Sequence, residues 1–121
     1  MIDDLLSLMD KLLSEDGCPW DREQTHKSLR KYMLEECNEA VEAIDNEDMK
    51  ALCEELGDVL LQVVFHAKIA EKVGAFTMDD VIRGIVSKLV SRHTHIFGND
   101  KAATAEDVAK LWAANKKKER V

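Results

Sequence analysis

The sequence is poor in the residues that interrupt regular structure: its 121 residues include one proline and five glycines. So few turn-forming residues are typical of long helices. No segment alternates apolar and polar residues for long enough to indicate a strand. We therefore predict an all-α fold, a bundle of about four or five helices that forms a single domain over residues 1–121.

Aromatic and basic residues are also scarce. Aromatic side chains make up 5% of the chain, which argues against a stacking platform for single-stranded nucleic acid. The 24 acidic residues outnumber the 17 basic ones, and a net charge of −7 repels a phosphate backbone. A basic tail at Lys116–Arg120 is short, so nucleic-acid binding through it is a weak alternative. We predict no nucleic-acid partner, and a phosphorylated ligand then requires a local basic patch or a metal.

Membrane-spanning and secretory segments are missing as well. No apolar run approaches the roughly 20 residues needed to cross a bilayer, and Met1–Leu13 lacks a basic leader and a cleavage site. The three cysteines match no zinc spacing, which indicates free thiols in a reducing compartment. Cys37 and Cys53 fall among apolar helical positions, where buried thiols are common. We therefore predict a cytoplasmic protein with no membrane partner.

Apolar residues at helical spacing divide the chain into five predicted helices. Their ranges are 2–13, about 25–44, about 47–72, about 78–92 and about 105–120. Cys18–Asp21 is expected to form a turn and residues 93–100 a loop. Thr77 and Thr104 each begin a capping pattern, and Asn46 is expected to cap the third helix.

The third predicted helix is apolar nearly all round between Leu56 and Ala67. Such a helix is buried on more than one side. Because the chain offers few other helices to cover it, a second copy is the natural source of the extra contact. We therefore predict a homo-oligomer, with a dimer as the expected state.

Acidic residues form two clusters, one on the second and one on the third predicted helix. Glu36 and Glu39 are three residues apart, as are Glu55 and Asp58, so each pair projects from one helix face. A short connection predicts that the two helices pack antiparallel, which lets the pairs face each other. Converging carboxylates repel one another and, once desolvated, need compensation that a divalent cation provides.

The type of ligand indicates the type of cation. Carboxylates without histidine or cysteine suit Mg²⁺ or Mn²⁺, and Mg²⁺ commonly binds substrate phosphates beside protein carboxylates. A solvated glutamate-rich face is the alternative, since 34% of the chain is charged. Two details favour the metal site. Both pairs adjoin apolar stripes, and Gly57, which is unfavourable in a helix by roughly 1 kcal/mol relative to alanine, suggests close approach of another backbone or a ligand.

Basic and aromatic residues supply candidate substrate contacts. Lys88 and Arg92 are four residues apart on the fourth predicted helix, where they suit a polyphosphate, although cations also favour helix C-termini for electrostatic reasons. Lys31 is a weaker candidate of the same kind. Trp20 and Trp112 are candidates for stacking on a base, with ordinary packing as the alternative.

The same residues resemble a known family. Glu35–Glu39 followed by Glu55–Asp58 is similar to the EExxE…ExxD signature of the all-α nucleoside triphosphate pyrophosphohydrolases. Further segments resemble the MazG branch of that group, in the family's order and over nearly the whole chain. These are Gly17–Asp21, Gln24–His26, Glu55–Ala67, Lys88-Leu89, Arg92-His93, His95–Gly98 and Trp112.

The resemblance implies a helical fold, usually dimeric, that hydrolyses nucleoside triphosphates to the monophosphate and pyrophosphate. It implies Mg²⁺ at Glu36, Glu39, Glu55 and Asp58. It also implies substrate phosphates near Lys88 and Arg92, and the nucleotide near Trp112. The clearing of abnormal nucleotides is the role linked to the family.

The chain departs from the family pattern in two ways. Many MazG proteins carry two tandem copies of the domain, and this chain has one copy that resembles the first. Cys37 and Asn38 stand in the motif interior, where an aromatic residue is expected. These departures bear on rate and base preference rather than on metal binding.

The resulting hypothesis is metal-assisted hydrolysis at the α-phosphorus, with Glu35 or Glu39 orienting or deprotonating the water. Lys88 and Arg92 would offset charge on the departing pyrophosphate. The alternative is a non-catalytic or weakly active helical module that dimerises and binds a regulatory nucleotide. Consumption of the nucleotide distinguishes the two.

Overall fold

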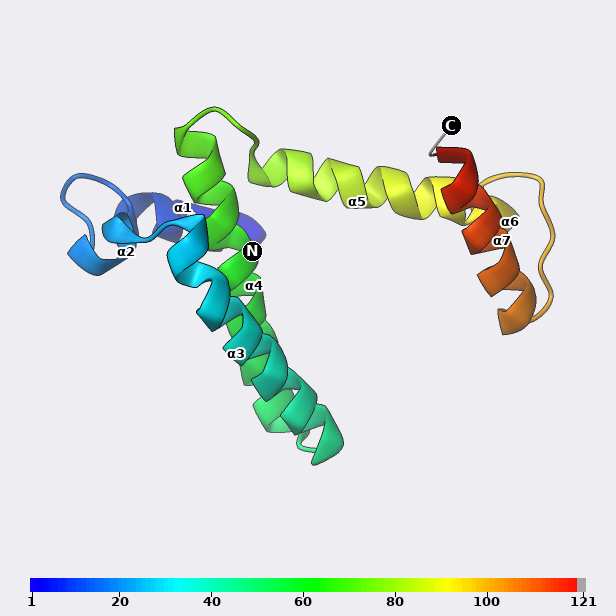
Figure 1. The fold of residues 1–121 in the computed structure, drawn as a ribbon, viewed down its shortest axis with the longest axis horizontal. Coiled ribbons are helices and arrows are strands. Elements are labelled where there is room, and N and C mark those ends of the chain that lie inside the picture. Colours follow the sequence, from blue (N-terminus) through cyan, green and yellow to red (C-terminus); the bar gives the residue numbers. More distant parts are fainter. Residues whose placement is uncertain (120–121) are drawn as a thin grey trace. The chain divides into compact units, whose positions relative to one another are not determined.

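The computed structural model describes residues 1–119, and this part of the chain forms seven helices and no strand. The all-α prediction is therefore confirmed, and the five longer helices correspond to the five predicted ones. Arg120, at the end of the predicted basic tail, lies outside the described residues. In chain order the helices are α1 (Ile2–Leu12), α2 (Pro19–Glu23), α3 (His26–Asp45), α4 (Met49–Lys72), α5 (Met78–Arg92), α6 (Thr94–Phe97) and α7 (Ala105–Glu119) (Figure 1).

The chain divides into two compact units, Met1–Met78 and Asp79–Val121. The first contains α1 to α4, and the second contains most of α5 together with α6 and α7. The prediction of one domain over residues 1–121 stays a prediction. No helix among the described residues is long and apolar enough to cross a membrane.

The antiparallel pair of α3 and α4 dominates the first unit (Figure 1). A capping box starts α3: the Thr25 side chain accepts a hydrogen bond from the Ser28 amide at 3.0 Å, and the Ser28 hydroxyl accepts one from the Thr25 amide at 2.8 Å. Such reciprocal bonds satisfy amides that have no partner inside the helix. The prediction that two neighbouring antiparallel helices carry the acidic clusters is confirmed.

The connection between α3 and α4 is a tight C-terminal cap. Glu47 has a positive φ of 54°, and its amide donates to the Ile44 carbonyl at 3.0 Å. The Asp48 amide donates to the Ala43 carbonyl at 3.0 Å, which completes a Schellman motif. Asn46 was predicted to cap the third helix, but that prediction is wrong because Asn46 is still helical at the end of α3. Asp48 caps α4 instead, accepting from the Ala51 amide at 3.1 Å.

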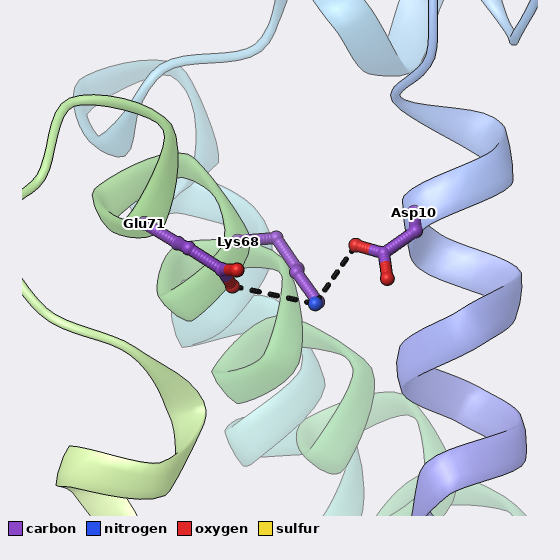
Figure 2. Close-up of polar contacts among 3 residues, drawn as sticks. All are labelled: Asp10, Lys68 and Glu71. Atoms are coloured by element: carbon purple, nitrogen blue, oxygen red, sulfur yellow. Dashed lines mark hydrogen bonds and ion pairs between the residues drawn. The ribbon is translucent and has the colours of Figure 1, made fainter.

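The core of the first unit lies where α1 crosses the helical pair. Met9, Leu29 and Val64 are almost completely buried, and they come from α1, α3 and α4 respectively. Figure 2 shows an ionic link at the same crossing, where the Lys68 ammonium lies 2.8 Å from Asp10 and 3.3 Å from Glu71. The hydrogen bond that the Lys68 ammonium donates to Asp10 is the main cause of a raised pKa for Lys68. The link fixes α1 against α4 on one side of the core.

Two segments predicted as irregular are short helices. The turn expected at Cys18–Asp21 is the start of α2, because a proline is well suited to the first position of a helix, where no amide donor is required. The loop expected at residues 93–100 contains α6. The burial expected for Cys37 and Cys53 is also wrong, since both free thiols are exposed.

Candidate metal centre

Four carboxyl groups meet between α3 and α4. Glu36, Glu39, Glu55 and Asp58 each offer one oxygen, and these oxygens all lie within 4.8 Å of one another. Glu36 and Glu55 are half-buried, whereas Glu39 and Asp58 are exposed. The three-residue spacing on each helix and the antiparallel packing bring the two pairs together, as the sequence predicts.

The crowding of the four carboxyl groups raises the pKa of two of them, Glu36 and Glu55. A hydrogen bond with Glu39, followed by loss of water and the charges of Glu39 and Asp58, raises the pKa of Glu55 to about 7. Burial is the main cause of a raised pKa for Glu36, and the neighbouring Glu39 and Asp58 carboxylates add to it. Two carboxyl groups can share a hydrogen bond only while one of them keeps its proton. The metal-free cluster therefore retains a proton near neutral pH.

Two oxygens of the cluster lack a partner in the described part of the chain, and a bound cation would supply one. Glu36 Oε2 and Glu55 Oε2 are buried and have no hydrogen-bond partner within residues 1–119. A buried carboxylate oxygen without a donor is unfavourable, and a positive ion would satisfy both atoms. An all-carboxylate set is also the donor chemistry of a hard divalent cation. The residues present fit such a group.

The other residues predicted near this cluster do not belong to the four-carboxyl set. Glu35 is exposed and lies outside the four-carboxyl set, although its charge helps to raise the pKa of Glu36. The Lys31 ammonium lies 5.0 Å from the ring centre of Tyr32. Gly57 is exposed, and a side chain there would meet no atom within 4 Å in the described chain. No segment of the described backbone therefore approaches Gly57, and the alternative expectation, close approach of a ligand, stays a prediction.

A cavity of about 250 Å³ opens beside the cluster and includes Glu36 in its wall. Trp20 and Tyr32 also line it, and their rings meet edge to face with centres 5.8 Å apart. Sequence reasoning selected Trp20 but missed Tyr32 and the buried Gln62, which line the same cavity. The signal for Gln62 was available, because it is a polar residue inside the apolar segment Leu56–Ala67.

The remaining predicted substrate contacts belong to the second unit. The guanidinium of Arg92 is buried and lies 5.0 Å from the ring centre of Trp112. Asn115 supports this pair by donating to the Arg92 carbonyl at 3.2 Å. Lys88 is exposed one turn before Arg92. The structure thus brings Arg92 and Trp112 together within this unit, and their contact with a nucleotide stays a prediction.

Comparisons with known proteins identify relatives. The family model of the MazG nucleotide pyrophosphohydrolase domain matches residues 24–97. The chain is 49% identical to the nucleoside triphosphate pyrophosphohydrolase/pyrophosphatase MazG of Thermotoga maritima, over 100% of this chain and 49% of that protein. It is 43% identical to the nucleoside triphosphate pyrophosphohydrolase of Escherichia coli K12, over 98% of this chain and 46% of that protein. The chain therefore spans about half the length of these curated relatives.

A solved structure is similar in fold. The crystal structure of a MazG-related protein from Thermotoga maritima superposes with a TM-score of 0.78 at 26% sequence identity. The match covers 95% of this chain and 98% of that one. The all-helical fold is therefore shared with a MazG-related protein, and the match covers nearly all of both chains.

Proposed function

The chain belongs to the MazG nucleotide pyrophosphohydrolase family, and from that premise we propose that it hydrolyses nucleoside triphosphates to the monophosphate and pyrophosphate. The observation that carries the proposal is the convergence of four carboxyl groups, two of them with raised pKa values, beside a cavity. Clearing of abnormal or excess nucleotides is the proposed role.

Glu36, Glu39, Glu55 and Asp58 would hold Mg²⁺, and Mn²⁺ suits the same oxygens. When bound, the cation supplies a Lewis acid that draws charge from the phosphate oxygens. Glu35 or Glu39 would orient the attacking water or accept its proton, since both are exposed carboxylates on α3 and Glu39 belongs to the cluster. The raised pKa of Glu55 means that this group gives up a proton when a positive charge arrives.

The substrate's other parts require separate contacts. Lys88 and Arg92 would offset charge on the pyrophosphate, with Lys31 as a weaker contributor. Trp20 is half exposed at the wall of the cavity beside Glu36, which suits contact with a base. Trp112 is proposed to contact the nucleotide together with Arg92, whose guanidinium it already covers.

A homodimer is proposed from the apolar surface of the helical pair. Large apolar side chains on α3 and α4 are exposed in the single chain, and burying them stabilises an assembly by about 25 cal/mol per Å². They are Leu34, Val41, Ile44, Met49, Leu56 and Leu60.

A second candidate function is a non-catalytic or weakly active module that dimerises and binds a regulatory nucleotide. The observation behind it is that the chain corresponds to about half of the two curated relatives named above, so the activity named for those proteins refers to longer chains. This candidate predicts nucleotide binding without consumption.

The test is incubation of the purified chain with a panel of nucleoside triphosphates and Mg²⁺, with products separated by chromatography. Monophosphate plus pyrophosphate, abolished by EDTA, supports the proposal. Diphosphate plus orthophosphate contradicts the position of cleavage. Binding of nucleotide without turnover supports the regulatory candidate.

A further inference from the structure

The cavity beside the carboxyl cluster is built from four helices of the first unit. Its wall combines apolar residues with polar and aromatic ones. The lining residues from α1, α2, α3 and α4 include Met9, Trp20, Tyr32, Glu36, Gln62 and Phe65. Because Glu36 belongs to both the cavity and the carboxyl cluster, a ligand in the cavity lies next to the proposed metal site.

Gln62 is the unexplained group in this cavity. Gln62 is 7% exposed, and its side-chain Oε1 has no hydrogen-bond partner among residues 1–119. Buried amide oxygens are almost always hydrogen-bonded, because an unpaired one has lost its water without replacement. An apolar side chain of similar shape would suit the fold better at this position. Because Gln62 lines the cavity, a ligand there that brings a hydrogen-bond donor would satisfy this buried oxygen once the carboxamide turns toward it.

The volume and the lining of the cavity indicate which kind of ligand would bring the donor. A volume of about 250 Å³ lies below the roughly 300–1,000 Å³ typical of sites for drug-sized ligands, so it suits one ring system rather than a whole nucleotide. The exposed Trp20 ring and the Tyr32 ring offer aromatic surface to a flat ligand. A nucleobase is flat, carries N–H groups on its edge, and is attached to the phosphates that the neighbouring cluster would hold.

We propose that Gln62 reads the nucleobase of the substrate, with its carboxamide oxygen accepting a hydrogen bond from an N–H group on the base edge. This inference rests on the proposed function, and it makes Gln62 a specificity-determining residue. The substrates it favours are triphosphates whose base presents an N–H donor. Triphosphates whose base lacks that donor leave the buried oxygen unpaired and are disfavoured.

The decisive variant is Gln62→Met, which keeps the length of the side chain and removes the amide. Two substrate pairs differ in the donor: adenosine against purine riboside triphosphate, which lacks the amino group, and uridine against N3-methyluridine triphosphate, whose methyl group also adds bulk. The wild type is expected to lose about tenfold or more in kcat/KM on the donor-free member of a pair. Gln62→Met is expected to lose the same factor on the parent substrate and to stop distinguishing the pair.

Two controls separate base reading from a structural role. A ribose triphosphate without a base should be turned over equally by the wild type and Gln62→Met. Thermal unfolding should also shift upward in Gln62→Met, because an unpaired buried amide is removed. Gln24 is the matched glutamine, since its amide donates to the Trp20 carbonyl and accepts from the Ser28 hydroxyl. Gln24→Met should unfold at a lower temperature and still distinguish the pairs.

A fall in the unfolding temperature of Gln62→Met, or an equal loss on the base-free triphosphate, would overturn the proposal. If the wild type hydrolyses no triphosphate, the proposed function fails, and base reading is then tested by calorimetry with nucleosides alone. Tighter binding of adenosine than of purine riboside, abolished in Gln62→Met, would support base reading without catalysis. Equal binding of the two nucleosides would overturn it.

Discussion

At the scale of single residues, four carboxyl groups of the first unit meet and repel one another. The metal-free protein relieves the repulsion by keeping a proton on Glu55, whose pKa is raised from 4.5 to about 7. A bound cation would relieve it instead by supplying opposite charge. Proton and metal therefore compete for the same cluster, which makes both stability and metal binding depend on pH.

Glu55 should make the metal-free protein less stable as pH rises. Below about pH 4.5 the carboxyl group is protonated in the folded and unfolded chains alike, so it has no effect. Between pH 4.5 and about 7 the unfolded chain releases the proton and the folded chain keeps it, so stability falls across this window. Urea unfolding in EDTA should show the wild type losing stability relative to Glu55→Gln between these values. A pH-independent difference would contradict the assignment.

Removing one ligand carboxylate should abolish most Mg²⁺-dependent turnover. Glu36→Gln keeps the shape but removes the charge, and we expect kcat/KM to fall by about 100-fold or more. Glu42→Gln is the matched control, because Glu42 is exposed on the same helix and lies outside the four-carboxyl set. Equal activity of Glu36→Gln and the wild type at limiting Mg²⁺ would exclude Glu36 as a ligand.

The predictability of the site differs between its residues for a physical reason. Glu36 with Glu39, and Glu55 with Asp58, were found because a three-residue spacing and a short connection are local properties of the sequence. Tyr32 and Gln62 were missed because they line a cavity that exists only after α1 and α2 have packed onto the helical pair. For Gly57, no backbone of the described chain approaches closely enough to explain a glycine, and the approach of a ligand stays a prediction.

At the scale of helices, caps decide where each element begins and ends. Thr104 was predicted as a cap, and its side chain accepts a hydrogen bond from the Asp107 amide three residues later. The Thr25 side chain accepts from the Ser28 amide in the same way, but the sequence analysis did not single it out as a cap. Asn46 was misassigned because it is one of several capping residue types in a short polar segment, and the actual cap, Asp48, follows two residues on. The helix over Pro19–Glu23 was missed because a proline that stops one helix also starts another.

One substitution in the turn between α3 and α4 should increase the stability of the folded protein. Glu47 has a φ of 54°, which is strained for a residue with a side chain and unstrained for glycine. Glu47→Gly should stabilise the protein by about 1 kcal/mol in urea unfolding. Asn46→Gly is the matched control, because Asn46 has an ordinary helical φ of −84° and should gain nothing. Equal effects of the two substitutions would contradict the Schellman geometry.

At the scale of the whole molecule, the exposed apolar face of α3 and α4 is a feature that packing within the first unit does not explain. The core of the first unit buries Met9, Leu29 and Val64, yet Leu56 and Leu60 on α4 remain exposed. The nearly continuous apolar character of the third predicted helix anticipated this surplus. The sequence alone does not fix which residues stay outside, because that depends on how α1 lies across the pair.

The dimer should dissociate when a charge is placed on this face. Leu60 is 40% exposed on α4, and Leu60→Lys would bury an unpaired ammonium in the proposed interface, which strongly disfavours association. Val73→Lys is the control with the same change in net charge, because Val73 is 77% exposed just beyond the end of α4. Sedimentation analysis should give a dimer for the wild type and Val73→Lys, and a monomer for Leu60→Lys at the same concentration. A wild type that is monomeric at every concentration would disprove the dimer. A Leu60→Lys protein that remains dimeric would place the interface on another face.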